Sequence, residues 1–269
     1  MEIHDSIYSA EFSGQQDHSR RSFISKASAA GLILSVGAGS SAFAERHQQG
    51  NIKAVAFDAF AIFDPRPVFA LTEKIFPGKG KEIVETWRIR QFEYCWIRET
   101  AGQYKDFLGI TADALLFAAR KAQVTLDEAV RNILVNAYLS LETWPDVLPA
   151  LEFLRKKSIR LGFLSNMTAA MLDSNIRHNG LLEYFEAVLS TDQLKTYKPS
   201  PQSYQMAVDA FRLKKSEILF VAFASWDATG SRWFGYPTYW LNRMDAPIEE
   251  LSVSIEMTGK FLDGIRLLV

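Results

Sequence analysis

The run from Ala54 to Phe57 is the sequence feature that most constrains the fold of this chain. Its residues are small or apolar, none is charged, and Asp58 follows directly. A strand that is covered on both faces has no solvated side, so this run predicts a buried strand of a parallel sheet. Open α/β sheets bind their ligands above the carboxyl ends of their strands. Asp58 is therefore the first candidate for chemistry, and a simple turn-capping role is the alternative.

Short apolar segments alternate with amphipathic helices in the second half of the chain. We expect helices over residues 147–157, 169–178 and 203–211, and Asn179-Gly180 is a good stop for the second of them. We expect further strands over 161–164, 187–190, 218–221 and 238–241, the last being the final strand of the sheet. This alternation predicts an α/β fold with a doubly wound parallel sheet of the Rossmann-like kind.

The stretch between the first and second predicted strands has helical patterns. Apolar residues recur at helical spacing over 81–98, 111–122 and 126–141. We therefore predict a helical cap domain over residues 66–143, inserted after the first strand. The core domain would then comprise residues 51–65 and 144–269.

The first fifty residues differ in character from the rest. Arg20-Arg21 and Phe23 precede an uncharged, mostly apolar stretch over 27–43, and Ala42-Phe43-Ala44 offers small residues for cleavage. This order resembles a twin-arginine export signal over residues 1–44, which implies a periplasmic protein whose partner is the twin-arginine export machinery. The apolar stretch is shorter than the roughly 20 residues of a membrane-spanning helix, so we expect no stable membrane anchor. A chance basic pair before a short apolar helix is the alternative.

Composition narrows the classes of partner and site. The chain has 269 residues, a formal net charge of -1 and 48% hydrophobic residues, which suits a sizeable core. Near-neutral charge gives no reason to expect nucleic acid as a partner. Cys95 is the only cysteine, so it forms no internal disulfide, and it lies outside any Cys/His cluster with metal-ligand spacing.

Polar residues follow the predicted strands at their carboxyl ends, where parallel strands meet at one edge. Their set and order resemble the haloacid dehalogenase superfamily, and more closely its L-2-haloacid dehalogenase branch, from about Lys53 to the region of Arg243. The segments that carry the resemblance are Phe57-Asp58-Ala59-Phe60, Trp87-Arg88-Ile89-Arg90-Gln91-Phe92-Glu93-Tyr94, Leu164-Ser165-Asn166, Tyr197-Lys198-Pro199 with Tyr204, and Ser225-Trp226-Asp227-Ala228-Thr229-Gly230.

One residue separates this branch from the phosphatases of the superfamily. Those enzymes have a second acid two positions after the nucleophile, where it helps to hold magnesium and protonates the leaving group. Phe60 occupies that position here and performs neither task. The resemblance therefore implies a hydrolase that uses no metal and no cofactor.

The resemblance implies a mechanism for short-chain (S)-2-haloacids, which would become (R)-2-hydroxyacids. Asp58 would displace halide to form an enzyme ester that water then hydrolyses. Lys198 would offset the negative charges of nucleophile and substrate, and Asp227 would orient Lys198 or the water. The other positions that match the branch's substrate- and halide-binding residues are Arg88, Ser165, Asn166, Phe60, Phe92, Trp226 and Tyr204.

Each of these residues also has an ordinary structural reading. Arg88 would be a solvated helix charge, Lys198 a loop residue, and the aromatic residues would belong to the core. Aromatic helices in the insertion could also support a homodimer.

Three replacements fall inside the expected site. Ile62, Ala222 and Ala224 stand where the branch has a threonine, a serine and an asparagine. Losing one such contact costs on the order of a hundredfold in rate. The alternative function is therefore a weakened or inactive relative that binds a small carboxylate or a protein partner. Retention of Asp58, Arg88, Lys198 and the other matching residues favours the enzyme.

Overall fold

Residues 52–269 are described by a computed structural model, and the export signal predicted over residues 1–44 lies outside them. The described chain forms a six-stranded sheet in the order β3-β2-β1-β4-β5-β6, and every adjacent pair is parallel. The predicted α/β fold with a parallel sheet is confirmed. The strands are β1 (Ala54–Phe57), β2 (Arg160–Ser165), β3 (Ala187–Ser190), β4 (Ile218–Ala222), β5 (Thr238–Leu241) and β6 (Met257–Gly259).

The prediction that residues 238–241 form the last strand is wrong. β6 follows and pairs in parallel with β5 at the edge of the sheet. It contains only Met257, Thr258 and Gly259, none of which is fully buried. A three-residue edge strand of this kind has no apolar run, so hydrophobic patterning gives no signal for it.

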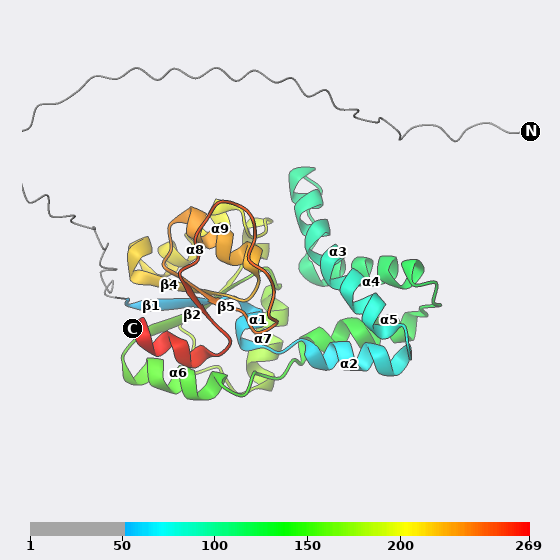
Figure 1. Ribbon diagram of the computed structural model, residues 1–269, viewed down its shortest axis with the longest axis horizontal. Coiled ribbons are helices and arrows are strands. Elements are labelled where there is room, and N and C mark those ends of the chain that lie inside the picture. The colour runs from blue at the N-terminus through cyan, green and yellow to red at the C-terminus, as the bar shows by residue number, and fades with distance from the viewer. Residues whose placement is uncertain (1–51) are drawn as a thin grey trace, which may run out of the picture. The chain divides into compact units, whose positions relative to one another are not determined.

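Helices cover both faces of the sheet (Figure 1). One face carries α6 (Val147–Lys156), α7 (Ala169–His178) and η4 (Leu262–Leu267), and the other carries α8 (Pro201–Phe211) and α9 (Ser225–Phe234). The alternation of β1 follows from this: Val55 and Phe57 enter one buried cluster, and Ala54 and Ala56 enter the other. β1 is buried on both sides, as its apolar sequence predicts.

A block of helices lies between β1 and β2 in sequence and beside the sheet in space (Figure 1). After the short α1 (Ala59–Ile62) come α2 (Arg66–Ile75), α3 (Gly80–Thr100), α4 (Phe107–Lys121), α5 (Glu128–Asn136) and η1 (Ala137–Leu139). We call α2 to η1 the helical insertion. α4 begins four residues before the predicted start at Thr111, because the Asp106 side chain caps it by accepting from the Gly109 N–H at 2.8 Å. The remaining short helices are η2 (Thr191–Leu194) and η3 (Lys215–Glu217).

The two connections between the sheet and the helical insertion pair with each other. Phe63 and Thr143 form an antiparallel bridge, and the Trp144 N–H donates to the Ile62 carbonyl at 3.1 Å. Asn175 on α7 and Asn179, the residue that follows this helix, hold the returning connection. The Asn175 amide donates to the Tyr138 carbonyl at 2.9 Å and accepts from the Leu141 N–H at 2.7 Å. The returning chain is therefore fixed to the core by side-chain amides.

We predict that Asn175→Ala destabilises the fold by about 2–4 kcal/mol, because it leaves buried backbone groups of the returning connection without partners. The measurement is urea unfolding followed by circular dichroism. Asp173→Ala is the matched control on the same helix, since it removes only an exposed ion pair with Arg177 and should change stability by less than about 0.5 kcal/mol. Equal effects of the two substitutions would contradict the prediction.

Candidate active site

The carboxyl edge of the sheet brings together residues from four parts of the chain. Asp58 follows β1, Ser165 and Asn166 lie at the end of β2, and Lys198 lies between η2 and α8. Asp227 lies in the first turn of α9, after β4. Their convergence is the arrangement expected from parallel strands, whose ends meet at one edge.

Lys198 is the centre of this cluster. Its ammonium donates to Asp58 Oδ1 at 2.9 Å and to Asp227 Oδ2 at 2.6 Å. The Lys198 side chain is 1% exposed, and the side chains of Asp58 and Asp227 are 11% and 1% exposed. Two carboxylates thus share one buried ammonium, so the cluster carries a net negative charge where water is largely excluded.

Burial and the attraction between Lys198 and the two carboxylates shift the pKa values of Lys198 and Asp227 in opposite directions. Burial lowers the pKa of Lys198, but Asp227 and Asp58 together raise it above its ordinary value of 10.5, so the ammonium stays charged. Burial raises the pKa of Asp227 to about 6, with Lys198 opposing the rise and Asp58 adding to it. Asp227 is therefore poised to exchange a proton near neutral pH.

The backbone and side chain of Lys198 are held from several elements. The Lys198 N–H donates to Asn166 Oδ1 at 2.8 Å, and the Trp96 indole donates to the Lys198 carbonyl at 3.1 Å. Trp96 lies on α3, so the helical insertion contributes directly to the placement of Lys198. Sequence reasoning missed Trp96, because a tryptophan at helical spacing looks like an ordinary core residue.

Tyr204 supports Asp227. Its hydroxyl donates to Asp227 Oδ1 at 2.7 Å, and its side chain is fully buried between the sheet and α9. We expected Tyr204 among the residues that bind substrate or halide. The structure instead places its hydroxyl on the second acid, where it leaves Asp227 Oδ2 to Lys198.

The contacts of Asp58 fit both roles that the sequence allows, the capping of a turn and a chemical function. Its Oδ2 accepts from the Phe60 N–H at 3.1 Å and so caps α1, while its Oδ1 accepts from Lys198. The same contacts fix the orientation of the carboxylate. A capping role and a chemical role are therefore compatible at this residue.

Arg88 is partly buried and reaches toward the edge of the sheet from α3. Its guanidinium lies 4.7 Å from the Phe60 ring centroid and 5.1 Å from that of Phe92. Phe92 in turn lies 5.1 Å from the Trp226 ring. The predicted aromatic residues Phe92 and Trp226 therefore contact each other, and Arg88 lies over the rings of Phe60 and Phe92. The alternative interpretation of Arg88 as a solvated helix charge does not fit these contacts.

Ser165 and Asn166 are buried beside this group. Ser165 Oγ accepts from the Met167 N–H at 3.1 Å. Asn166 uses its amide oxygen for Lys198, but its amide nitrogen is buried without a partner among the described residues. A buried donor of this kind is uncommon and is suited to an acceptor in a ligand.

The three replaced positions carry apolar side chains in the structure. Ile62 and Ala222 are fully buried, and Ala224 precedes α9 without making a side-chain cap. Ser225 does not substitute for a lost hydroxyl, because its Oγ donates to Glu249 at 2.6 Å. Phe223, between the two alanines, packs instead on Phe60, with ring centroids 6.0 Å apart.

Trp144 and Arg243 hold the backbone after Asp58, a role that we did not predict from the sequence. The Trp144 indole donates to the Phe60 carbonyl at 3.0 Å, and Arg243 donates to the Ala61 carbonyl at 3.3 Å. The Arg243 and Arg66 guanidinium groups lie 4.6 and 4.4 Å from the Trp144 ring. A tryptophan before Pro145 at a predicted domain boundary was the available signal.

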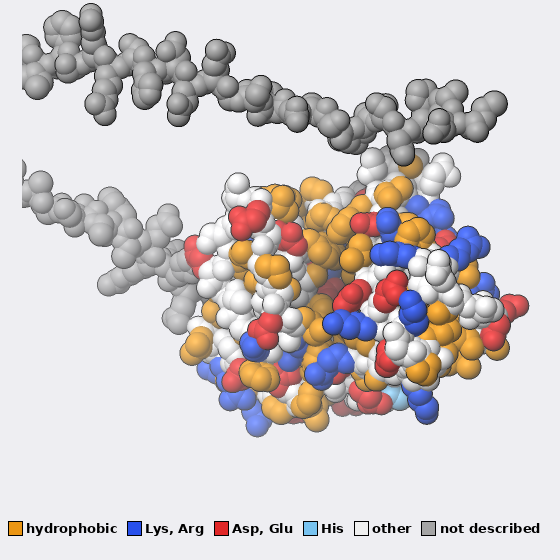
Figure 2. Space-filling model, turned by 45° about the vertical axis from the view of Figure 1, so that its right-hand side comes forward, with side chains coloured by type: hydrophobic (Ala, Val, Ile, Leu, Met, Phe, Trp, Pro, Cys, Tyr) orange, Lys and Arg blue, Asp and Glu red, His pale blue; other side chains and the backbone are white. Residues whose placement is uncertain are grey.

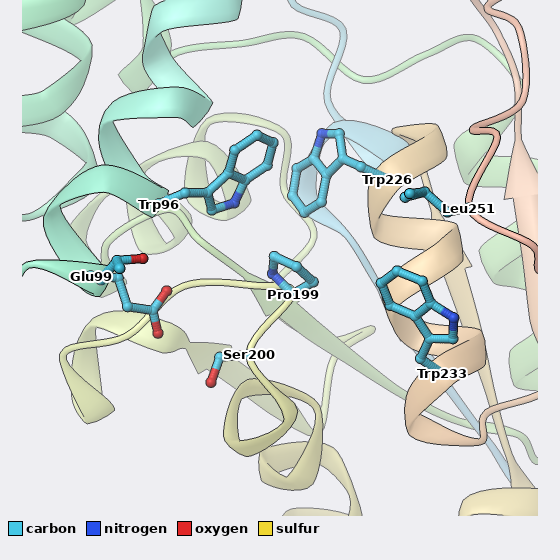
Figure 3. A pocket seen from close by; sticks show the side chains of 8 residues that line it. Trp96, Glu99, Pro199, Ser200, Trp226, Trp233 and Leu251 are labelled. Carbon is cyan, nitrogen blue, oxygen red and sulfur yellow. The ribbon is translucent and has the colours of Figure 1, made fainter.

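Hydrophobic side chains gather along the furrow between the sheet and the helical insertion, while charged side chains cover the outer face of the insertion (Figure 2). A cavity of about 490 Å³ lies between the end of α3 and α9. Trp96, Trp226 and Trp233 line it together with Pro199 and Leu251 (Figure 3). Its lining includes none of Asp58, Lys198 and Asp227, so this cavity is separate from the cluster around Lys198.

Two further properties concern residues 52–269 only. Within that range, no helix has the length and apolar character needed to cross a membrane. Over the same range, His, Cys, Asp and Glu side chains form no group of three or more that could hold a metal ion. Cys95 is buried, and its thiol contacts the Gln91 carbonyl oxygen.

Comparison with known proteins places this chain among hydrolases. A family profile described as haloacid dehalogenase-like hydrolase matches residues 52–235. An (S)-2-haloacid dehalogenase of Pseudomonas sp. (strain YL) is 39% identical over 74% of this chain and 87% of its own length. A haloacetate dehalogenase H-2 of Moraxella sp. (strain B) is 36% identical over 81% of this chain and 98% of its own length.

Solved structures show the same likeness. The crystal structure of the L-2-haloacid dehalogenase RSc1362 is 37% identical, with a TM-score of 0.78 over 81% of this chain and 97% of that chain. An L-2-haloacid dehalogenase from Xanthobacter autotrophicus with chloropropionic acid covalently bound is 29% identical, with a TM-score of 0.74 over 81% of this chain and 98% of its own.

We predict that Asp227 gives the folded chain a pH-dependent stability. Its native pKa of about 6 lies above its ordinary value of 3.8, so between these values the folded chain binds a proton that the unfolded chain has released. Stability relative to Asp227→Asn should therefore rise as pH falls from about 6 to about 4, by on the order of 1–3 kcal/mol, and stay level above pH 6.

The measurement is urea unfolding of both proteins across this range. Lys198 does not contribute in this window because its pKa is raised above 10.5. Parallel stability profiles for the two proteins would show that Asp227 has an ordinary pKa in the folded chain.

Proposed function

This chain belongs to the haloacid dehalogenase-like hydrolase family, and we propose that it releases halide from short-chain (S)-2-haloacids to give (R)-2-hydroxyacids. The observation that carries the proposal is the buried Lys198 ammonium, which contacts Asp58 at 2.9 Å and Asp227 at 2.6 Å. Relatives named (S)-2-haloacid dehalogenase support the substrate class.

In the first step, an Asp58 carboxylate oxygen attacks the halogen-bearing carbon from the side opposite the halogen. The new carbon–oxygen bond forms as the carbon–halogen bond breaks, and the halide leaves with the bonding electron pair. Lys198 lowers the repulsion between Asp58 and the substrate carboxylate. The buried aromatic side chains around Phe60 keep water away from the nucleophile and so preserve its reactivity.

In the second step, water attacks the acyl carbon of the Asp58 ester. Asp227 accepts one proton from that water as the new carbon–oxygen bond forms. The bond between the acyl carbon and the substrate oxygen then breaks, the leaving oxygen takes the proton from Asp227 to give the alcohol, and the second water proton is released to solvent as Asp58 returns to a carboxylate. Because the acyl carbon is attacked, the configuration of the substrate carbon is inverted only once, in the first step. The covalently bound chloropropionic acid in the Xanthobacter autotrophicus structure supports an ester intermediate for such relatives.

The substrate carboxylate and the halogen are separate substituents of the attacked carbon and would bind to separate groups of the site. We assign the carboxylate to Ser165 and neighbouring backbone, and the halide to Arg88 and Asn166. The unpartnered Asn166 amide nitrogen and the position of Arg88 over Phe60 support the halide assignment.

A second candidate function is that of a weakened relative that binds a small carboxylate or a protein partner. Ile62, Ala222 and Ala224 favour it, because the described site has no hydroxyl or amide at those positions. The residues that displace halide are retained, so the loss would fall on ester hydrolysis.

Location and assembly are further proposals. The Arg20-Arg21 signal supports export to the periplasm by the twin-arginine machinery. Ile89 and Ile97 on α3 are each 58% exposed, which supports a homodimer formed through that helix.

We predict sustained halide release from (S)-2-chloropropionate by the full-length chain, and its loss in Asp58→Asn, because the amide is not a nucleophile. Ion chromatography measures the halide, and mass spectrometry of quenched protein detects the ester. The R enantiomer is the matched control substrate. A single equivalent of halide with a persistent mass increase would place the defect in ester hydrolysis. Unchanged release in Asp58→Asn would refute the assignment of the nucleophile.

We predict that Ala224→Asn raises steady-state turnover, by about tenfold or more, without raising the rate of the first halide burst. The added amide supplies a partner for the hydrolytic water, which acts only in the second step. Rapid-quench measurement of the burst and the steady state separates the steps, and Ala224→Leu is the apolar control. An increase in the burst alone would show that water placement does not limit turnover.

A further inference from the structure

Tyr138 has a buried hydroxyl whose proton meets no acceptor among the described residues. It lies in η1, its side chain is 0% exposed, and its hydroxyl finds no partner among the described residues. A buried O–H without an acceptor is disfavoured, so such a group is expected to meet an acceptor from outside the chain.

The neighbours of Tyr138 belong to the candidate active site. Its ring packs edge-on against Phe60 with centroids 6.3 Å apart, and against Trp87 at 5.4 Å. Arg88 lies near enough to lower the pKa of the Tyr138 hydroxyl, although burial raises that pKa overall and keeps the hydroxyl protonated. Tyr138 and Arg88 thus both contact Phe60, and both offer donors.

No neighbour supplies an acceptor for the Tyr138 proton. Arg88 has donors only, so it can at most donate to the hydroxyl oxygen. The Gln91 amide oxygen accepts from Arg88 at 3.0 Å and its nitrogen donates to Thr111 at 2.7 Å, and none of the described residues accepts a hydrogen bond from the Tyr138 hydroxyl. The combination of an arginine and a free hydroxyl donor fits an anion.

The position of Tyr138 is fixed in advance. The Asn175 amide holds its backbone carbonyl at 2.9 Å, and the Phe60 and Trp87 rings restrict its side chain. A donor that needs no rearrangement stabilises charge as it develops. The Tyr138 hydroxyl therefore has a fixed position before any ligand binds.

We propose that the Tyr138 hydroxyl is a second donor, beside Arg88, to the halide that leaves the substrate. This assignment rests on the proposed dehalogenase function. As the carbon–halogen bond breaks, the halide takes the electron pair and accepts a hydrogen bond from Tyr138, which keeps its proton.

The test is Tyr138→Phe in the full-length chain, with (S)-2-chloropropionate and (S)-2-bromopropionate as substrates. We expect the halide burst to slow by about tenfold to a hundredfold for chloride and by less for bromide, because chloride is the stronger hydrogen-bond acceptor. The melting temperature should stay the same or rise, since the substitution removes an unpaired buried hydroxyl. Equal burst rates in the two proteins, or equal losses for both halides, would overturn the proposal.

Tyr239→Phe is the matched control. The Tyr239 hydroxyl donates to the Phe261 carbonyl at 2.8 Å, at the β5 edge of the sheet. Its loss should lower the melting temperature and leave the burst rates and the chloride-to-bromide ratio unchanged. The two variants therefore give opposite patterns if Tyr138 acts on the halide.

Chloride binding provides a readout that does not depend on turnover. Chlorine-35 NMR line broadening by the wild-type chain should weaken several-fold in Tyr138→Phe but not in Tyr239→Phe. If the wild type releases no halide yet shows this chloride difference, the proposed function fails while the anion site stands. If halide is released but neither the burst nor chloride binding responds to Tyr138→Phe, the function stands and the Tyr138 assignment fails.

Discussion

The buried contact of Lys198 with Asp58 and Asp227 is the interaction on which the rest of the site depends. Two carboxylates and one ammonium, almost free of solvent, would be costly without close hydrogen-bonded geometry. Removing Lys198 would leave two like charges buried together, whereas removing Asp227 would leave an ordinary pair. The arrangement therefore suits the proposed function, in which a negative nucleophile lies beside a negative substrate, and it contributes little to stability.

The elements around the site are arranged to keep that contact in place. β1 ends at Asp58, and Asn166 at the end of β2 holds the Lys198 backbone. Tyr204 on α8 fixes Asp227, and Trp96 on α3 reaches Lys198 from the helical insertion. Any movement of the insertion relative to the sheet would disturb the hydrogen bond between Trp96 and the Lys198 carbonyl. The insertion thus contributes both the aromatic wall and part of the electrostatic framework.

Much of the fold followed from hydrophobic patterning, and the misses have physical reasons. The bounds of β1, β3, β5 and α7 match the sequence prediction, because each is a buried run or a well-capped helix. β6 was missed because a short edge strand needs no apolar run. We did not predict the contacts of Trp144, Arg243 and Tyr138. These contacts join segments that are far apart in sequence, and hydrophobic periodicity describes only neighbouring residues.

Aromatic packing surrounds the replaced positions, where the sequence resemblance predicts polar contacts. It can supply only part of what those polar contacts would supply. Phe223 packs on Phe60 and lies near Trp144, while Trp144 and Arg243 hold the carbonyls after Asp58. In the mechanism that we propose, such packing would orient the nucleophile and exclude water, and both effects would favour displacement. It offers no donor or acceptor to the hydrolytic water of the proposed second step, which would then rely on Asp227. The two chemical steps therefore make different demands on the same replaced residues, and only the second demands what these residues lack.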